Sequence, residues 1–277
     1  MALGILLALG SALAWGGSDF FGGIASRRRS HVEVLAVSRV SLIVVLLVCV
    51  ALTGEQLPTL RSAVWAAGAG ISGALGIASL YRGLATQRSS LVMPTAGVVG
   101  AAVPVLFAGI FEGVLPILQQ AGLAVALVGI WLVSKGHDTD TAGASRGLGI
   151  GALAGIGFGG FFIMLGQVGA EAAFFPFLVA GVSGSAAAAL VLIFTGTSLP
   201  VPWKLPRALI AGMMDAAGLV CYGLAIRSIR LDIAAVLGSL FPAVAVLLFW
   251  GLAKERVSKQ QWFGIAVCVA AIGLIVS

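Results

Sequence analysis

The chain has 277 residues, of which 60% are hydrophobic and 9% charged, with a mean hydropathy of +1.12. This composition excludes a soluble globular protein, whose surface would need many more charged and polar residues. The net charge of +6 comes from basic residues scattered between apolar runs, which argues against a nucleic-acid-binding groove and indicates a helical integral membrane protein.

Ten apolar runs follow one another along the chain, each long enough to cross a bilayer as a helix. The first run contains the motif Ala12-Leu13-Ala14, typical of a signal-peptide cleavage site, but it lacks a basic n-region and is expected to remain as a helix. The runs are 3–24, 32–52, 63–85, 90–111, 116–134, 147–168, 173–196, 206–228, 232–252 and 258–277.

The polar segment 135–146 divides the chain almost in half, and the two halves carry similar motifs at a nearly constant spacing. The motif Tyr81-Arg82-Gly83-Leu84-Ala85 has a counterpart in Cys221-Tyr222-Gly223-Leu224-Ala225. We therefore expect two five-helix repeats, 1–134 and 147–277, joined by a cytoplasmic linker. An odd number of spans in each half makes the repeat an inverted one. Chance similarity among apolar helices is the alternative.

Lysine and arginine are distributed unevenly between the two sets of connecting segments. Twelve lie where odd-numbered runs end, and three lie on the opposite side. Because basic loops stay in the cytoplasm, both termini are predicted on the non-cytoplasmic side.

Asp215 is the most informative residue, because it lies nine residues into the run 206–228, about 13 Å deep in a hydrocarbon core about 30 Å thick. Ionisable residues at such depth usually face a bundle interior or an aqueous pathway. Asp215 would take up a proton or bind a cationic group, or else be a protonated or arginine-paired structural residue. Tyr222 shares its helix face as a pathway or packing residue. When the two Gly-Leu-Ala motifs are aligned, the position that matches Asp215 is Leu75, so the repeat is asymmetric there.

A second polar group lies nearer the cytoplasmic surface. Asp19 and Arg39 share a level roughly 7–11 Å below it, so an ion pair is geometrically reasonable. In the alternative, Arg39 extends to the lipid headgroups and Asp19 hydrogen-bonds to the backbone. Trp15, Ser18 and Asp19 form a polar and aromatic stripe on the first helix.

Five further residues are candidates for lining the pathway, although each alone is more often a packing residue. They are Tyr81, Arg82, Pro94, Phe158 and Phe241. The three cysteines lie inside apolar runs, and nucleotide-binding and metalloenzyme motifs are missing, so no cofactor or metal is predicted.

Several short motifs together resemble the drug/metabolite transporter superfamily, specifically its EamA-like members. They are AWGGSDF at 14–20, the two Gly-Leu-Ala motifs, and a closing pattern of Pro104, Glu112, Gln120 and Gly122 that returns as Pro242, Glu255, Gln261 and Gly264. The resemblance implies ten helices around a central cavity and export of amino acids, metabolites or drugs from the bacterial cytoplasm. Family members often have an uncharged residue where this chain has Asp19, and a carboxylate at Asp215 is not a general family feature.

We therefore predict a secondary transporter of the bacterial inner membrane, an exporter working by alternating access, with proton coupling as one option. Asp215 is predicted to bind the proton or the charged group of the substrate. Asp19 and Arg39 are predicted to act together as an electrostatic latch on the inner side. The expected partners are the lipid bilayer, a small-molecule substrate and protons, but no nucleic acid. A monomer is favoured, and a dimer stays open. The alternatives are a facilitator or channel, a flippase for lipid-linked substrates, and a membrane-embedded lipid-modifying transferase.

Overall fold

The computed structural model describes residues 1–27, 31–85, 89–134, 144–169, 174–195 and 205–276. Within these ranges the chain is helical, and nine segments are long and apolar enough to span a membrane, with a shorter apolar segment, Phe175–Ala187, beside them. The predicted all-helical membrane fold is confirmed. The helices are α1 (Ala2–Ser26), α2 (His31–Thr53), α3 (Leu60–Ala85), α4 (Ser89–Phe111), α5 (Ile117–Ser134), α6 (Ala144–Gly166), α7 (Phe175–Thr195), α8 (Pro206–Ala225), α9 (Leu231–Gly238), α10 (Phe241–Gly251) and α11 (Lys259–Val276).

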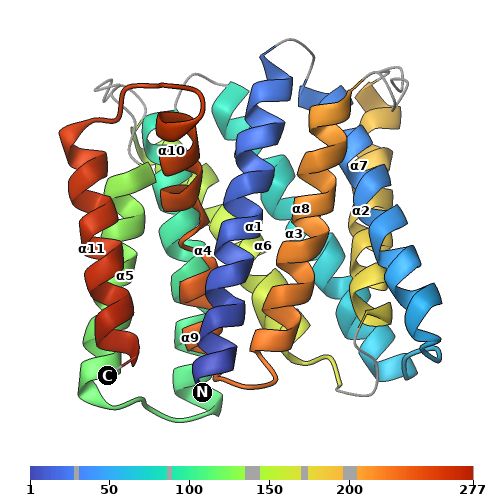
Figure 1. Cartoon of the computed structure of the whole chain (residues 1–277), viewed down its shortest axis with the longest axis horizontal. Helices are drawn as coiled ribbons and strands as arrows, with labels where there is room; N and C mark the ends of the chain where they lie inside the picture. The colour runs from blue at the N-terminus through green and yellow to red at the C-terminus, as the bar shows by residue number, and fades with distance from the viewer. Residues whose placement is uncertain (28–30, 86–88, 135–143, 170–173, 196–204, 277) are drawn as a thin grey trace.

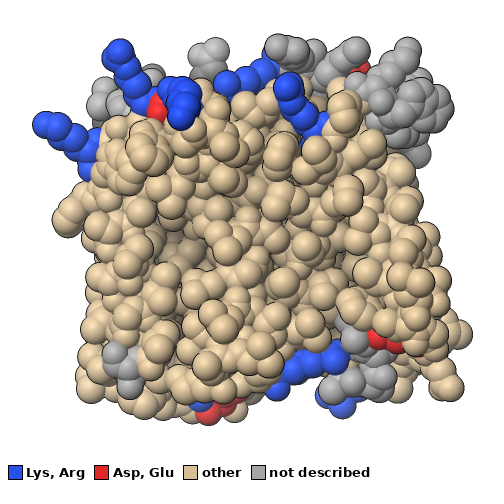
Figure 2. All heavy atoms as spheres, in the orientation of Figure 1, with Lys and Arg blue, Asp and Glu red and all other residues tan. Residues whose placement is uncertain are grey.

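The outer surface carries a broad band without charged side chains between two ends where the charged residues lie (Figure 2). Large apolar side chains such as Leu13, Leu75 and Leu106 are at least 60% exposed, as expected for residues that face lipid tails. Most of the described lysines and arginines gather at one end, which we call the basic end; the N- and C-termini lie at the other, the terminal end (Figures 1 and 2).

The third helix of each half packs against the first two helices of the other half: α8 lies on α1 and α2, and α3 lies on α6 and α7. Ser41 Oγ of α2 donates a hydrogen bond to the Leu209 carbonyl of α8 at 2.6 Å, and Ser183 Oγ of α7 donates one to the Ala67 carbonyl of α3 at 3.1 Å. Ser183 is separated from Ser41 along the chain by the same interval that separates Leu209 from Ala67, so the two bonds are counterparts. The bundle therefore consists of two halves with matching packing.

Glycines make this packing possible at the centre of the bundle. A Cβ atom at Gly218 of α8 would lie 2.6 Å from the Trp15 ring of α1, and one at Gly76 of α3 would lie 2.8 Å from the Phe158 ring of α6. Glycine lets helices approach closely where there is no room for a side chain. In Figure 1, α1 and α6 run in opposite directions, as an inverted repeat requires.

The ninth predicted run, 232–252, is not one helix. It is divided into α9 and α10 by Ser239 and Leu240, because Pro242 in the first turn of α10 cannot donate a backbone hydrogen bond. The break faces the middle of the bundle, where a Cβ atom at Gly238 would lie 3.2 Å from Ser11 Oγ and 3.3 Å from the Trp15 ring. By contrast, α4 continues through its two prolines.

Candidate substrate and ion pathway

The charged centre of the protein depends on a close approach between α2 and α8. Gly212 of α8 lies so close to α2 that an added Cβ atom would overlap the Ser38 carbonyl oxygen. The hydrogen bond from Ser41 to the Leu209 carbonyl fixes the same contact. Because the two backbones meet here, the side chains that follow, Arg39 and Asp215, are brought within reach of each other.

Arg39 and Asp215 form an ion pair, with 3.1 Å between Arg39 Nη1 and Asp215 Oδ2. Both residues belong to membrane-spanning helices. The Arg39 and Asp215 side chains are 22% and 25% exposed, so neither is fully enclosed by protein. A charged pair at this depth is stable only with a good partner geometry or water nearby. The predicted pairing of Arg39 with Asp19 is wrong, since Arg39 binds the carboxylate of the helix on which α2 packs.

Asp19 lies beside this ion pair on α1. Along the antiparallel contact of α1 with α8, Gly17 packs on Met214 and Gly22 lies near Ala211, which puts Asp19 at the level of Asp215. The two carboxylates are close enough to interact electrostatically. Asp19 is exposed and has no ion-pair partner among the described residues. We call Asp19, Arg39 and Asp215 the charge cluster: Asp215 binds the guanidinium, and the second carboxylate lies beside this pair.

Four aromatic rings close the bundle on the terminal side of the charge cluster. Trp15 of α1, Phe161 and Phe162 of α6, and Tyr222 of α8 form this aromatic cluster. The ring centroids of Phe162 and Tyr222 are 4.9 Å apart, and those of Trp15 and Tyr222 are 5.8 Å apart. Trp15 lies one turn from Asp19, and Tyr222 lies two turns from Asp215, so rings and charges form adjacent layers.

The Tyr222 hydroxyl is fully buried and has no hydrogen-bond partner in the described part of the chain. Tyr222→Phe is therefore expected to raise the free energy of unfolding by about 1 kcal/mol, because it removes an unsatisfied buried polar group. Thermal unfolding of the detergent-solubilised protein measures this effect. Tyr222→Leu, which also loses the ring contacts, should be less stable than the natural protein. A destabilised Tyr222→Phe variant would contradict the burial of an unpaired hydroxyl.

Comparison with known proteins identifies the family. The model of the EamA-like transporter family matches residues 2–135 and 145–277. The chain belongs to this family. It is a transporter rather than an enzyme, so the lipid-modifying transferase is set aside.

Known relatives of this EamA-like transporter cover almost the whole chain. It is 26% identical to the uncharacterized inner membrane transporter YedA of Escherichia coli strain K12, over 95% of this chain and 87% of that protein. The YedA proteins of Escherichia coli O6:H1 strain CFT073 and O157:H7 match at the same 26% identity. A solved structure titled "Crystal structure of protein" has a TM-score of 0.80 and 15% identity, covers 99% of this chain and 96% of its own, and shows the shared fold alone.

Polar contacts tie the terminal end of this EamA-like transporter together. Arg230 donates hydrogen bonds to the carbonyls of Glu112, at 3.0 Å, and Gly113, at 2.6 Å, and pairs with Asp232 at 3.0 Å. The hydrogen bond to Asp232, which is 2% exposed, raises the pKa of Arg230. This network was not predicted from the sequence, although Arg230 and Asp232 lie two residues apart at the start of a span.

At the basic end, α1 is tied to the region of α10 and α11. Arg27 forms an ion pair with Glu255, and its guanidinium lies 5.4 Å from the centroid of the Phe249 ring. Phe20 also contacts Phe249, with 5.0 Å between the ring centroids. These contacts fix the end of α1 beyond the charge cluster.

The other predicted pathway residues do not join the charge cluster or the aromatic cluster in the described part of the chain. Phe158 packs over Gly76 and Gly100, between α3, α4 and α6, and is not in ring contact with the aromatic cluster. Pro94 is buried inside α4, and Ser18 and Phe241 are half-buried. The side chains of Tyr81 and Arg82 lie outside the described part of the chain.

Proposed function

We propose that this EamA-like transporter is a secondary active exporter of small organic solutes that works by alternating access, with the basic end facing the cytoplasm of a bacterial inner membrane. The observation that carries the proposal is the Arg39–Asp215 ion pair within the spans, with Asp19 beside it. Charges at this depth are typical of a substrate or ion pathway.

The proposed orientation rests on the distribution of basic residues. Most of the described lysines and arginines lie at the end shown uppermost in Figure 2. Short loops rich in lysine and arginine remain on the cytoplasmic side of bacterial membranes. The charge cluster would then be reached from the cytoplasm, and the aromatic cluster would close the pathway toward the outside.

The charge cluster offers a simple means of coupling. With all three groups ionised, two carboxylates face one guanidinium, so one negative charge is left over. A proton, or a cationic group of the solute, would neutralise that excess and weaken the Arg39–Asp215 contact. Because this contact joins α2 to α8, breaking it would release one helix from the other. Binding energy can shift a conformational equilibrium only through such a difference between the two states.

Only one of the two matching packing arrangements, that of α1, α2 and α8, carries these charges. The matching hydrogen bonds of Ser41 and Ser183 align the two halves, and this alignment makes Gly181 the counterpart of Arg39 and Gly73 the counterpart of Asp215. The alignment on the Gly-Leu-Ala motifs, with Leu75 as the counterpart of Asp215, is therefore corrected. Coupling through an ion pair would belong to the α2–α8 contact alone.

Transport by the purified protein tests the proposal. A thermal-shift screen against metabolites, amino acids and drugs identifies a binding solute, because a ligand of the folded state raises its apparent stability. In proteoliposomes, that solute should then move with saturable kinetics, show counterflow, and accumulate when a pH gradient is imposed. Flux that rises linearly with concentration and shows no counterflow would indicate a channel or facilitator instead.

A further inference from the structure

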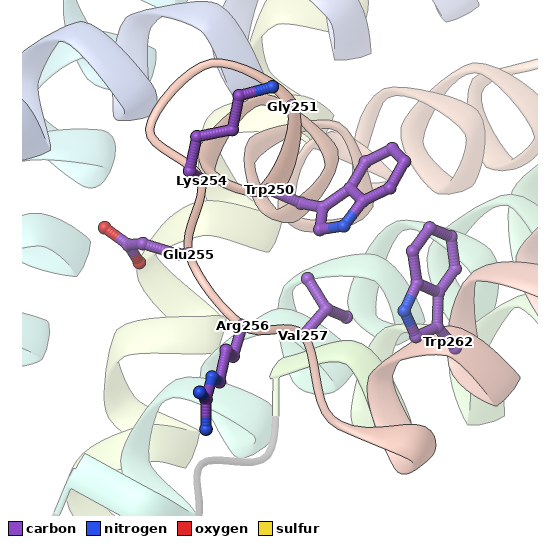
Figure 3. A pocket seen from close by; sticks show the side chains of 7 residues that line it. All are labelled: Trp250, Gly251, Lys254, Glu255, Arg256, Val257 and Trp262. Atoms are coloured by element: carbon purple, nitrogen blue, oxygen red, sulfur yellow. The ribbon is translucent and has the colours of Figure 1, made fainter.

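An open cavity of about 610 Å³, more groove than enclosed pocket, lies at the basic end between the last turn of α10 and the first turn of α11 (Figure 3). It is formed by Trp250, the turn that follows α10, and Trp262. It is separate from the charge cluster, since none of its lining residues belongs to α1, α2 or α8. In Figure 1, α11 forms one edge of the bundle together with α5, where lipid would surround it.

Two tryptophans form the apolar wall of this cavity. Their rings meet edge to face, with centroids 5.1 Å apart and an interplanar angle of 84°. Trp250 is 48% exposed and Trp262 is 40% exposed. Tryptophan is enriched at the membrane–water interface, where its ring lies at the level of the lipid headgroups. The cavity is therefore at the right depth to receive a headgroup from the side.

The polar wall of the cavity is positively charged. Lys254 and Arg256 are exposed, and neither has an ion-pair partner among the residues that the structure describes. The one acidic residue of the turn, Glu255, is neutralised by Arg27, and in Figure 3 its carboxylate points away from the tryptophans. Two cations without an ion-pair partner among the described residues therefore remain on this turn, and in Figure 3 their side chains extend in opposite directions from it.

The turn that carries these cations has a defined shape. Lys254 has a φ of 58°, the left-handed region that costs a residue with a side chain about 1 kcal/mol or more. The Glu255 amide donates to the Phe249 carbonyl at 3.1 Å, and Ser258 and Gln261 cap the start of α11 reciprocally. The cations are thus held on an ordered turn.

We propose that this cavity binds the phosphate-bearing headgroup of an anionic phospholipid, with the acyl chains lying along Trp250 and Trp262. Lys254 and Arg256, on the two sides of the turn, would attract the anionic headgroup, since basic pockets at the cytoplasmic surface attract such headgroups. The site itself does not depend on the proposed transport function; only the assignment of the lipid to the cytoplasmic leaflet rests on the proposed orientation.

Native mass spectrometry of the purified protein with equal amounts of phosphatidylglycerol and phosphatidylcholine tests the site. The natural protein should retain phosphatidylglycerol preferentially, and the double variant Lys254→Gln/Arg256→Gln should lower that preference on the order of tenfold. Arg207→Gln, which removes an exposed cation at the same end outside the cavity, serves as the matched control and should retain it. Equal preference in the natural protein and the double variant, or equal loss in the control, would overturn the proposal.

A second measurement distinguishes a lipid from a free anion. Phosphatidylglycerol should raise the thermal midpoint of the natural protein more than that of Trp250→Leu, because that variant keeps the cations but loses the apolar wall. Inorganic phosphate should produce no shift that depends on Lys254 and Arg256. A phosphate shift of the same size and the same dependence on these residues would assign the cavity to a free anion and overturn the lipid site. Both readouts are independent of transport.

Discussion

Replacing Asp215 with asparagine is expected to abolish transport driven by a pH gradient, lowering the initial rate by at least about 100-fold, within the range lost when a positioned proton-transfer group is removed. Asparagine keeps the shape of the side chain but can neither accept a proton nor carry the charge that binds Arg39. The guanidinium would lose its 3.1 Å partner inside the spans. Gradient-driven uptake in proteoliposomes, with the solute found by thermal shift, measures the effect.

Reduced folding has to be separated from lost coupling in this experiment. Leaving Arg39 unpaired should cost about 1–3 kcal/mol of stability, since the pair is only partly buried. The thermal midpoint and the reconstituted amount of Asp215→Asn are therefore measured beside its rate. Glu33→Gln makes the same chemical change near the start of α2, outside the charge cluster, and should transport normally. Full gradient-driven activity in folded Asp215→Asn would rule out the assigned role.

Gly212→Ala is expected to lower the free energy of unfolding by about 2–4 kcal/mol, more than most overpacking substitutions. Its new methyl group would overlap the Ser38 carbonyl oxygen, and a backbone atom inside a helix cannot rotate away as a side chain can. The helices α2 and α8 would be forced apart, and the hydrogen bond from Ser41 to the Leu209 carbonyl would lengthen. Thermal unfolding in detergent measures the loss.

Two other glycines serve as controls for this substitution. At Gly109 of α4 an added Cβ meets nothing within 4 Å, so Gly109→Ala should be neutral or slightly stabilising. Gly70, the counterpart of Gly212 in the other half, would clash with the Ala180 carbonyl. Gly70→Ala should therefore destabilise the fold without touching the Arg39–Asp215 pair. Gly212→Ala as stable as Gly109→Ala would contradict the close approach of α2 and α8.

The membrane fold could be predicted from the sequence because a span is defined by length and hydropathy alone. The first predicted run, 3–24, is the helix Ala2–Ser26, and the run 116–134 contains α5. The division of the ninth run was not predicted, since a proline interrupts α9 and α10 but leaves α4 continuous. Neighbouring helices decide which of these outcomes a proline produces.

The candidate site could be predicted only in part, for a related reason. Counting residues put Asp19 and Arg39 at one level and Asp215 deeper in the membrane, at about 13 Å. The Arg39–Asp215 ion pair instead brings the deeper residue into the same cluster. Which carboxylate binds Arg39 depends on which helix α2 packs against. Gly212, one turn before Asp215, was the residue in the sequence that indicated this packing, since a glycine on the same face as a polar residue indicates close helix packing.

A double-mutant cycle on Arg39 and Asp215 tests most directly whether the ion pair is a working part of the transport cycle. Gradient-driven initial rates are measured for the natural protein, Arg39→Gln, Asp215→Asn and the double variant, all at matched reconstitution. If the two side chains act as one unit, either single change should remove most of the activity and the double variant should be no worse than the more damaged single one. Losses that multiply as independent effects would contradict a functional pair.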